Sequence, residues 1–169
     1  MSDLLADLVP WPKVDFAAFG EIETKKIGKI QKLVGAFLGR NWVAIPHVTH
    51  QDEADITELE VRRRQHNASA ETKLTIVPLL IKALAQGLKQ FPQFNCSLDP
   101  DAGDIVFKKY CHIGVAVDTP GGLLVPVIND CDTKPVDQIA AEIAALSEKA
   151  RTKGLSMAEM SGGCITLTS

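Results

Sequence analysis

Two apolar runs separated by a Pro-Gly-Gly turn constrain the fold of this chain more than any other feature. The runs lie within residues 114–127, and the turn between them contains Pro120, Gly121 and Gly122. Apolar runs joined by such turn residues are typical of a β-hairpin. We therefore predict a strand, a hairpin turn and a second strand, with the acidic residue Asp118 at the bend.

Side chains alternate between the two faces of a strand, which assigns each residue of the first run to a face. His112, Gly114, Ala116 and Asp118 are predicted to share one face. The opposite face is apolar throughout and consists of Cys111, Ile113, Val115 and Val117. A glycine inside a strand often marks the close approach of a ligand or another backbone, so we interpret the first face as a channel wall. The alternative is that Gly114 permits tight packing and that Asp118 caps the turn.

The first half of the chain predicts an extended arm followed by three helices. Residues 1–24 show no sustained periodicity, whereas apolar residues recur at helical spacing after them. Asp55 followed by Glu58 forms a capping-box pattern, and Thr75 is an expected N-cap. The helices are expected at residues 27–39, 55–66 and 75–91, with an extended segment at 45–54 and a polar loop at 67–71.

The second half predicts the remaining elements of an α/β fold. Pro135 is expected to begin a helix that Gly154 ends. A turn is expected at residues 99–103, a strand that opens at 105–107 and leads into the hairpin, and a last strand at 165–169. Because strands and helices are interleaved, we expect a mixed sheet with flanking helices.

Size, charge and cysteine content exclude several classes of protein. The 169 residues suit one domain, and the net charge of -3 argues against a nucleic-acid-binding surface. The four cysteines have no CxxC spacing, so neither a metal site nor a disulfide scaffold is predicted. No apolar run approaches the ~20 residues that cross a bilayer, and the acidic N-terminus differs from a signal peptide. The sequence therefore predicts a cytoplasmic protein without membrane, metal or nucleic-acid partners.

Four segments in a fixed order resemble one family, and two further segments resemble one of its branches. The four are residues 41–49, 91–95, 114–127 and 162–169. They are similar to the catalytic domain of the dihydrolipoamide acyltransferases of 2-oxo acid dehydrogenase complexes. Residues 10–16 and 19–23 are similar to the acetyl-transferring branch, which belongs to bacterial pyruvate dehydrogenase complexes.

The resemblance implies a fold, a reaction and a set of partners. The implied fold is that of chloramphenicol acetyltransferase, with residues 1–24 as an arm and residues 25–169 as the N-terminal part of the catalytic domain. The implied reaction transfers an acetyl group between a dihydrolipoyl-lysine arm, carried on a separate lipoyl domain, and coenzyme A. Homotrimers would assemble into a larger core, and other domains would bind pyruvate dehydrogenase and dihydrolipoamide dehydrogenase.

The resemblance also implies roles for individual residues. Thr168 stands where the family places the hydroxyl that stabilises the oxyanion. Asp118 stands at the acid that lines the channel for the lipoyl or pantetheine arm, and Gly121 and Gly122 form the turn beside it. His112 shares the predicted face of Asp118 and is a further channel candidate, although a hydrogen-bonded structural imidazole is the stronger interpretation.

The general base of the family is a histidine in an Asp-His-Arg-x-x-Asp/Asn-Gly segment that has no counterpart in this sequence. None of His47, His50, His66 or His112 stands in such a segment. We therefore expect a sheet that is incomplete at the C-terminus and a segment that is inactive alone. The alternatives are a non-catalytic, self-assembling scaffold and a succinyl or branched-chain acyltransferase of the same family. Cys164 as a covalent acyl carrier is a weaker hypothesis, because direct thiol attack makes an acyl-enzyme unnecessary.

Overall fold

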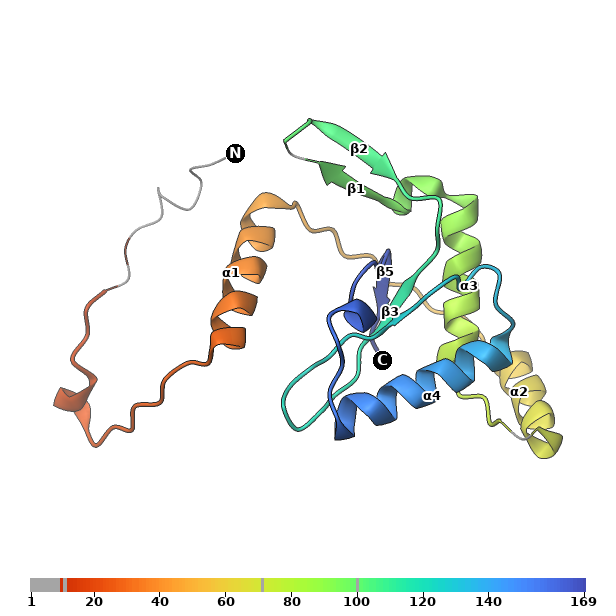
Figure 1. Cartoon of the computed structure of the whole chain (residues 1–169), viewed down its shortest axis with the longest axis horizontal. Coiled ribbons are helices and arrows are strands. Elements are labelled where there is room, and N and C mark those ends of the chain that lie inside the picture. Colours follow the sequence, from red (N-terminus) through yellow and green to blue (C-terminus); the bar gives the residue numbers. More distant parts are fainter. Residues whose placement is uncertain (1–9, 11, 71, 100) are drawn as a thin grey trace. The chain divides into compact units, whose positions relative to one another are not determined.

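The chain folds into two compact units, Met1–Ala54 and Asp55–Ser169. The structure is a computed structural model that describes residues 10, 12–70, 72–99 and 101–169. Its mixed helices and strands confirm the predicted α/β class (Figure 1). The predicted boundary after residue 24 stays a prediction, and parts of the predicted arm, loop and turn (residues 1–9, 11, 71 and 100) lie outside the described residues. Within the described part, no helix is both long enough and apolar enough to cross a bilayer.

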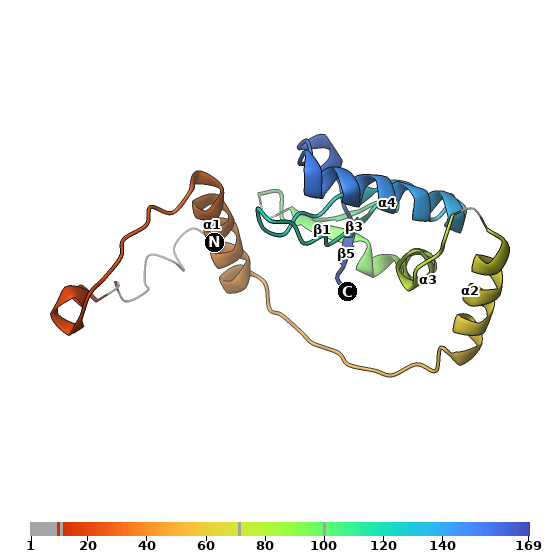
Figure 2. The ribbon, with the colours of Figure 1, turned by 90° about the horizontal axis from the view of Figure 1, so that it is seen from below.

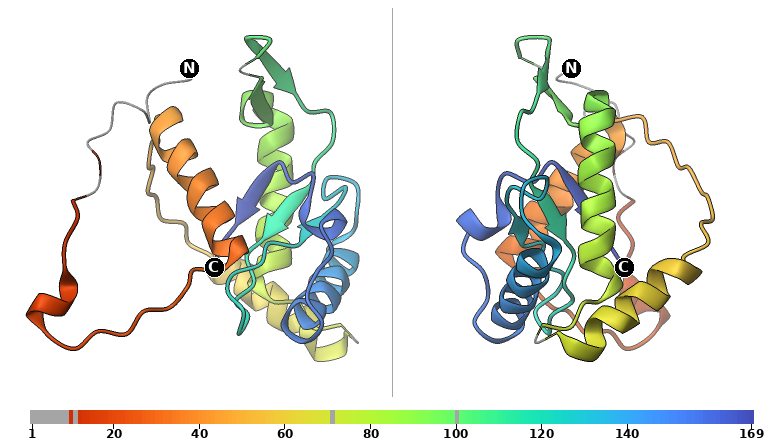
Figure 3. Two further views of the ribbon diagram at one scale, coloured as in Figure 1. Left: turned by 60° about the vertical axis from the view of Figure 1, so that its left-hand side comes forward. Right: turned by 90° about the vertical axis from the view of Figure 1, so that its right-hand side faces the viewer.

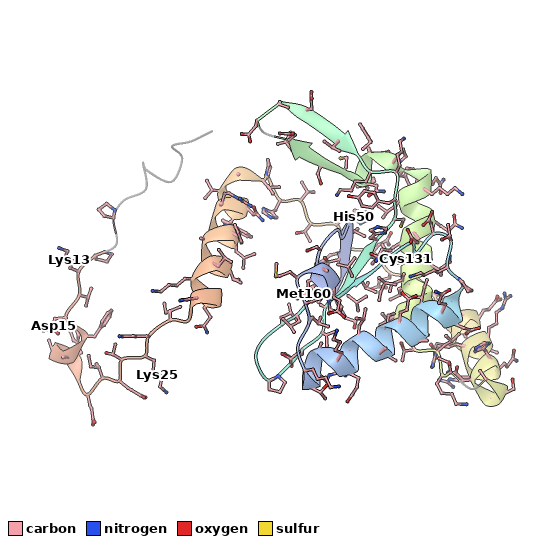
Figure 4. All side chains as sticks on the ribbon, in the orientation of Figure 1. Lys13, Asp15, Lys25, His50, Cys131 and Met160 are labelled. Atoms are coloured by element: carbon pink, nitrogen blue, oxygen red, sulfur yellow. The ribbon has the colours of Figure 1, made fainter. Side chains whose placement is uncertain are left out.

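The described part of the first unit contains a short 3₁₀ turn and one helix. Asp15 caps the turn η1 (Phe16–Phe19) by accepting a hydrogen bond from the amide of Ala17 at 3.2 Å, and Figure 4 labels it with Lys13 and Lys25. Helix α1 spans Lys29–Ala44. The prediction that this helix ends near Gly39 is wrong. An interior glycine costs only about 1 kcal/mol, whereas Pro46 forces the residue before it out of the helical region, and Ile45 has φ -115°.

The second unit begins with helix α2 (Thr57–Ser69), which confirms the predicted helix and extends it by three residues. Asp55 accepts hydrogen bonds from the amide and hydroxyl of Thr57 at 2.8 and 2.6 Å, which lowers the pKa of its carboxyl group. The reciprocal bond expected of Glu58 is not formed: Ile56 rather than Asp55 is the N-cap of the helix, and the Glu58 carboxylate lies 3.6 Å from Arg62. Figure 2 shows α2 at the end of the unit where α4 begins.

Side chains of α2 explain why the helix continues into the predicted loop as far as Ser69. Asn67 pairs with both backbone groups of Leu74, donating to its carbonyl at 2.9 Å and accepting from its amide at 2.8 Å. Arg63 donates to the same carbonyl at 2.8 Å. Asn67 thus links the last turn of α2 to the segment that leads into the next helix.

A three-stranded sheet and two helices form the core of the second unit. The sheet has the order β4-β3-β5, with β3 (Ile113–Val115), β4 (Val127–Ile128) and β5 (Ile165–Leu167). Helix α3 spans Ile76–Gln90, and α4 spans Val136–Thr152 and lies across it (Figure 1). Both helices and the sheet contribute to one buried cluster, which consists of Ile81, Ala85, Leu88, Cys111, Ile113, Val115, Ile128, Cys131 and Ile139.

A separate two-stranded ribbon corrects one sequence prediction. After the 3₁₀ turn η2 (Pro92–Phe94), strand β1 (Cys96–Asp99) pairs with β2 (Asp104–Phe107). Both views in Figure 3 show this ribbon projecting beyond the end of α3. The strand that opens at Ile105 therefore does not run on into the hairpin as predicted. The chain turns between the two because the buried side-chain amide of Asn95 donates to the carbonyls of Lys108 and Tyr110 at 3.2 and 2.9 Å.

Candidate functional site

The first apolar run forms β3, and its two faces are those predicted from the sequence. Cys111, Ile113, Val115 and Val117 are each at most 7% exposed and pack into the unit's interior. The hairpin is also confirmed: β4 runs antiparallel to β3, and an isolated bridge joins Val117 to Leu124. The opposite face of β3 starts at His112 and continues through Gly114 and Ala116 to Asp118.

Strand β5 adds two threonines to that second face. It runs parallel to β3, with Gly114 opposite Thr166, and the ladder continues because the Ala116 amide donates to the carbonyl of Leu167 at 2.9 Å. This register brings Thr168 next in line beside Ala116. Gly114, Ala116, Thr166 and Thr168 therefore form a surface of small side chains, which we call the small-residue face. Its two threonines are exposed.

Gly114 is explained by contacts within this face. A Cβ atom at Gly114 would lie 2.8 Å from Cγ1 of Val125 and 3.1 Å from Oγ1 of Thr166. These separations are shorter than ordinary van der Waals contacts, so no larger residue fits without displacing a neighbour. Tight packing, the alternative interpretation of this glycine, therefore accounts for it without a ligand.

Asp118 lies in an exposed loop at the end of the same face. The bridge between Val117 and Leu124 closes the loop. In this bridge the amide of Val117 donates to the carbonyl of Leu124 at 2.8 Å, and the amide of Leu124 donates to the carbonyl of Val117 at 3.0 Å. Asp118 follows Ala116, the residue beside Thr168 in this register, by two positions, or about 7 Å along an extended chain. The pairing of Asp118 with Thr168 in one site stays a prediction. Gly122 has φ +115°, which favours glycine at this position of the turn.

Sequence reasoning missed a third residue in this loop, Thr119. Its hydroxyl donates to the carbonyl of Gly122 at 2.6 Å and accepts from the amide of Gly121 at 3.3 Å. The available signal was a threonine directly before Pro-Gly-Gly, because threonine hydroxyls commonly bond to the backbone of turns.

His112 lies at the other end of the face and is held by structural contacts. Its Nδ1 accepts a hydrogen bond from the amide of Asp130 at 3.0 Å, and its ring lies 4.6 Å from that of Tyr110. Four residues of extended chain separate it from Ala116, or about 13 Å, so it does not reach Thr168. His66, the other histidine of this unit, contacts Asp137 at 3.2 Å. Neither supplies a base beside Thr168.

The buried thiols are unsuited to nucleophilic chemistry. Burial and the neighbouring Cys131 raise the pKa of the Cys111 thiol from 9.0 to about 11. Cys131, labelled in Figure 4, is fully buried, and burial raises the pKa of its thiol as well. The thiol of Cys164 lies 3.4 Å from the carbonyl of Tyr110. No group of three metal-ligating side chains occurs among the described residues.

Comparisons with known proteins identify a family that this chain matches over most of its length. The profile described as 2-oxoacid dehydrogenases acyltransferase (catalytic domain) matches residues 19–169. The dihydrolipoyllysine-residue acetyltransferase component of the Haemophilus influenzae pyruvate dehydrogenase complex is 48% identical over 96% of this chain. The Cupriavidus necator component of the same description is 52% identical over 96% of the chain. The chain spans 30% of the length of each of these two relatives.

Solved structures agree with the sequence matches. A solved structure of Azotobacter vinelandii dihydrolipoamide acetyltransferase, studied for the role of a serine, a histidine and an asparagine in its catalytic mechanism, superposes with a TM-score of 0.88 at 49% identity. The cubic core of a pyruvate dehydrogenase multienzyme complex gives the same values. Both matches cover 95% of this chain and 68% of the solved chain.

Proposed function

The chain belongs to the family of 2-oxoacid dehydrogenase acyltransferase catalytic domains, and we propose that it forms part of a core that transfers an acetyl group between dihydrolipoyl-lysine and coenzyme A. One observation supports the proposal: the register of β3 and β5 continues to Ala116, so that the hydroxyl-bearing Thr168 comes beside it, two residues before the acidic Asp118. Acetyl is proposed over succinyl or branched-chain groups because the relatives described above are acetyltransferases.

The reaction is an exchange of an acetyl group between two thiols. A base removes the proton of the attacking thiol, whose ordinary pKa near 8.5 leaves it mostly protonated at neutral pH. The thiolate attacks the thioester carbon, and the carbonyl oxygen becomes an oxyanion. When this intermediate collapses, the C–S bond of the leaving thiol breaks, and that thiolate takes up a proton. Thr168 donates a hydrogen bond to the oxyanion, a contribution worth on the order of 3 kcal/mol in comparable sites.

Asp118 and the turn beside it serve the substrate arms. The lipoyl and pantetheine arms both carry amide groups, and an exposed carboxylate accepts hydrogen bonds from amide N–H groups. Gly121 and Gly122 carry no side chain into this space, so the backbone of the turn can approach an arm closely.

The base comes from outside the second unit in this proposal. His66 and His112 are engaged with Asp137 and with the amide of Asp130. The family resemblance assigns the role to a histidine in the Asp-His-Arg segment, and because this sequence contains no such segment, transfer requires a polypeptide that carries it. Assembly of homotrimers into a larger core is supported by the similarity to a cubic core. Lipoyl domains, pyruvate dehydrogenase and dihydrolipoamide dehydrogenase are the proposed partners in the complex.

A scaffold role without catalysis is the second candidate, and the β1–β2 ribbon favours it. Leu98, Ile105 and Phe107 share one face of the ribbon in its antiparallel register and are 63%, 60% and 49% exposed. Two-stranded ribbons are marginally stable in water, so this apolar face is a surface for assembly. Light scattering on the purified protein separates the candidates: a closed multimer without transfer activity would support the scaffold alone.

The enzymatic proposal is tested at Thr168 in a polypeptide that also carries the Asp-His-Arg segment. Thr168→Ala is expected to lower kcat for transfer from acetyl coenzyme A to dihydrolipoamide by about 10²–10³-fold. Thr168→Ser keeps the hydroxyl and is expected to retain most of the activity. The control Thr152→Val removes a hydroxyl that bonds to Glu148 at the end of α4. Equal rates for Thr168→Ala and this control would refute the role of Thr168.

A further inference from the structure

Thr119 alone accounts for the hydrogen bonds within the loop that carries Asp118. Within residues 118–123, as the structure describes them, each internal hydrogen bond involves Thr119. Its carbonyl accepts from the amide of Gly122 at 3.0 Å, and its hydroxyl makes the two bonds to Gly121 and Gly122 described above. The bridge between Val117 and Leu124 fixes only the ends of the loop.

The hydroxyl of Thr119 uses both its donor and its acceptor capacity. It donates to one glycine and accepts from the other, so it fixes the two residues whose backbones are the least restricted in any turn. Asp118 precedes Thr119 directly, and its own side chain makes no bond to any described residue. The direction of the carboxylate is therefore set by the backbone of the loop, which the Thr119 hydroxyl holds.

We infer that Thr119 is a positioning residue, which holds the Asp118 carboxylate in the place where it contacts a substrate arm. This inference rests on the proposed acetyl transfer. Without the hydroxyl, the loop samples several conformations, and Asp118 must be ordered each time a substrate binds. Thr119 itself touches no reacting atom, so its loss weakens substrate binding and leaves the chemical step intact.

The test is the steady-state kinetics, with acetyl coenzyme A and dihydrolipoamide, of variants made in a polypeptide that also carries the Asp-His-Arg segment. Thr119→Val preserves the shape of the side chain and removes both hydroxyl bonds. We expect it to raise the KM of at least one thiol substrate by about 3–10-fold, as the loss of one or two hydrogen bonds implies, with kcat nearly unchanged. Thr119→Ser keeps the hydroxyl and is expected to restore the original KM.

A double-mutant cycle with Asp118→Ala separates positioning from a general structural effect. If Thr119 acts through Asp118, Thr119→Val has no further effect on KM once the carboxylate is absent. Thr133→Val is the matched control, since its hydroxyl donates to the carbonyl of Asp130 at 3.2 Å in a turn outside the site. It is expected to leave KM unchanged.

The possible outcomes distinguish this inference from the proposed function. Transfer by the unmodified protein, combined with additive effects of Thr119→Val and Asp118→Ala, overturns the positioning role alone. An unchanged KM in Thr119→Val, or a failure of Thr119→Ser to restore it, does the same. No transfer by the unmodified polypeptide that carries the Asp-His-Arg segment overturns the proposed function and the inference with it.

Discussion

Gly114 on β3 and Thr166 on β5 lie opposite each other in a parallel ladder, so closely that a Cβ atom at Gly114 would be 3.1 Å from the threonine hydroxyl. The same atom would be 2.8 Å from Cγ1 of Val125. The β-branched side chain of valine is restricted in its rotation about χ1 and cannot swing away freely. The spacing of the strands and the packing of the hairpin therefore both depend on the absence of a side chain at Gly114.

Gly114→Ala is expected to destabilise the protein by about 1–3 kcal/mol, the usual cost of an extra methyl group in a filled site. Urea denaturation measures the change in the free energy of unfolding. Truncating the opposing side chain in Gly114→Ala/Val125→Ala should relieve the clash, so the double variant should lose less than the sum of the single changes.

Gly87→Ala is the control for the substitution itself. Gly87 lies inside α3, and nothing within 4 Å would meet its Cβ atom. Alanine is the better helix former there, so this variant should gain up to about 1 kcal/mol. A stability gain at Gly114 similar to that at Gly87 would refute the packing explanation.

Local patterns predicted the elements that local forces determine. The alternation of residues 111–118 assigned the faces of β3 correctly because burial on one side imposes a period of two. The helix predicted between Pro135 and Gly154 was also confirmed, because local residues determine where it begins and ends. Pro135 is its N-cap, and Gly154 follows it with φ +76°. In the site, the family resemblance rather than any local pattern drew attention to Thr168.

Long-range contacts decided what sequence patterns could not. The break between β2 and β3 depends on Asn95, whose amide bonds to carbonyls 13 and 15 positions further along the chain. His112 shares the face of Asp118 as predicted, but the amide of Asp130, 18 residues away, holds its ring. Such partners become neighbours only when the sheet and the loops are assembled, so periodicity carries no signal for them.

Lys82 provides a second prediction, since its ammonium group binds the loop that precedes α4. It donates to the carbonyls of Cys131, Asp132 and Lys134 at 3.0, 3.0 and 2.9 Å. Lys82→Met keeps the length of the side chain and leaves these acceptors without their donor. We expect a loss of about 1–3 kcal/mol in the free energy of unfolding, measured in urea.

Lys89→Met is the matched control for the loss of a lysine from α3. Lys89 is exposed, and its ammonium group bonds to no described residue, so the change should stay within about 0.5 kcal/mol. If the two variants were equally stable, the three carbonyl bonds of Lys82 would contribute nothing to folding.

Glu159 makes stability depend on pH in the acidic range. Its carboxylate accepts hydrogen bonds from Lys149 at 2.6 Å and from the amide and hydroxyl of Ser156 at 2.8 and 2.7 Å. These bonds, with that of Lys149 the strongest, lower the pKa of Glu159 from 4.5 to about 2. Because the folded state lowers this pKa, the stabilisation is complete above pH 4.5 and disappears as the pH falls toward 2. The melting temperature of Glu159→Gln should therefore lie below that of the unmodified protein at pH 6, and the two values should converge near pH 2.

Glu148→Gln removes an α4 carboxylate that bonds to no described residue, and its melting temperature should follow that of the unmodified protein at every pH. A constant difference between Glu159→Gln and the unmodified protein from pH 6 to pH 2 would rule out the ionised carboxylate as the source of the stabilisation.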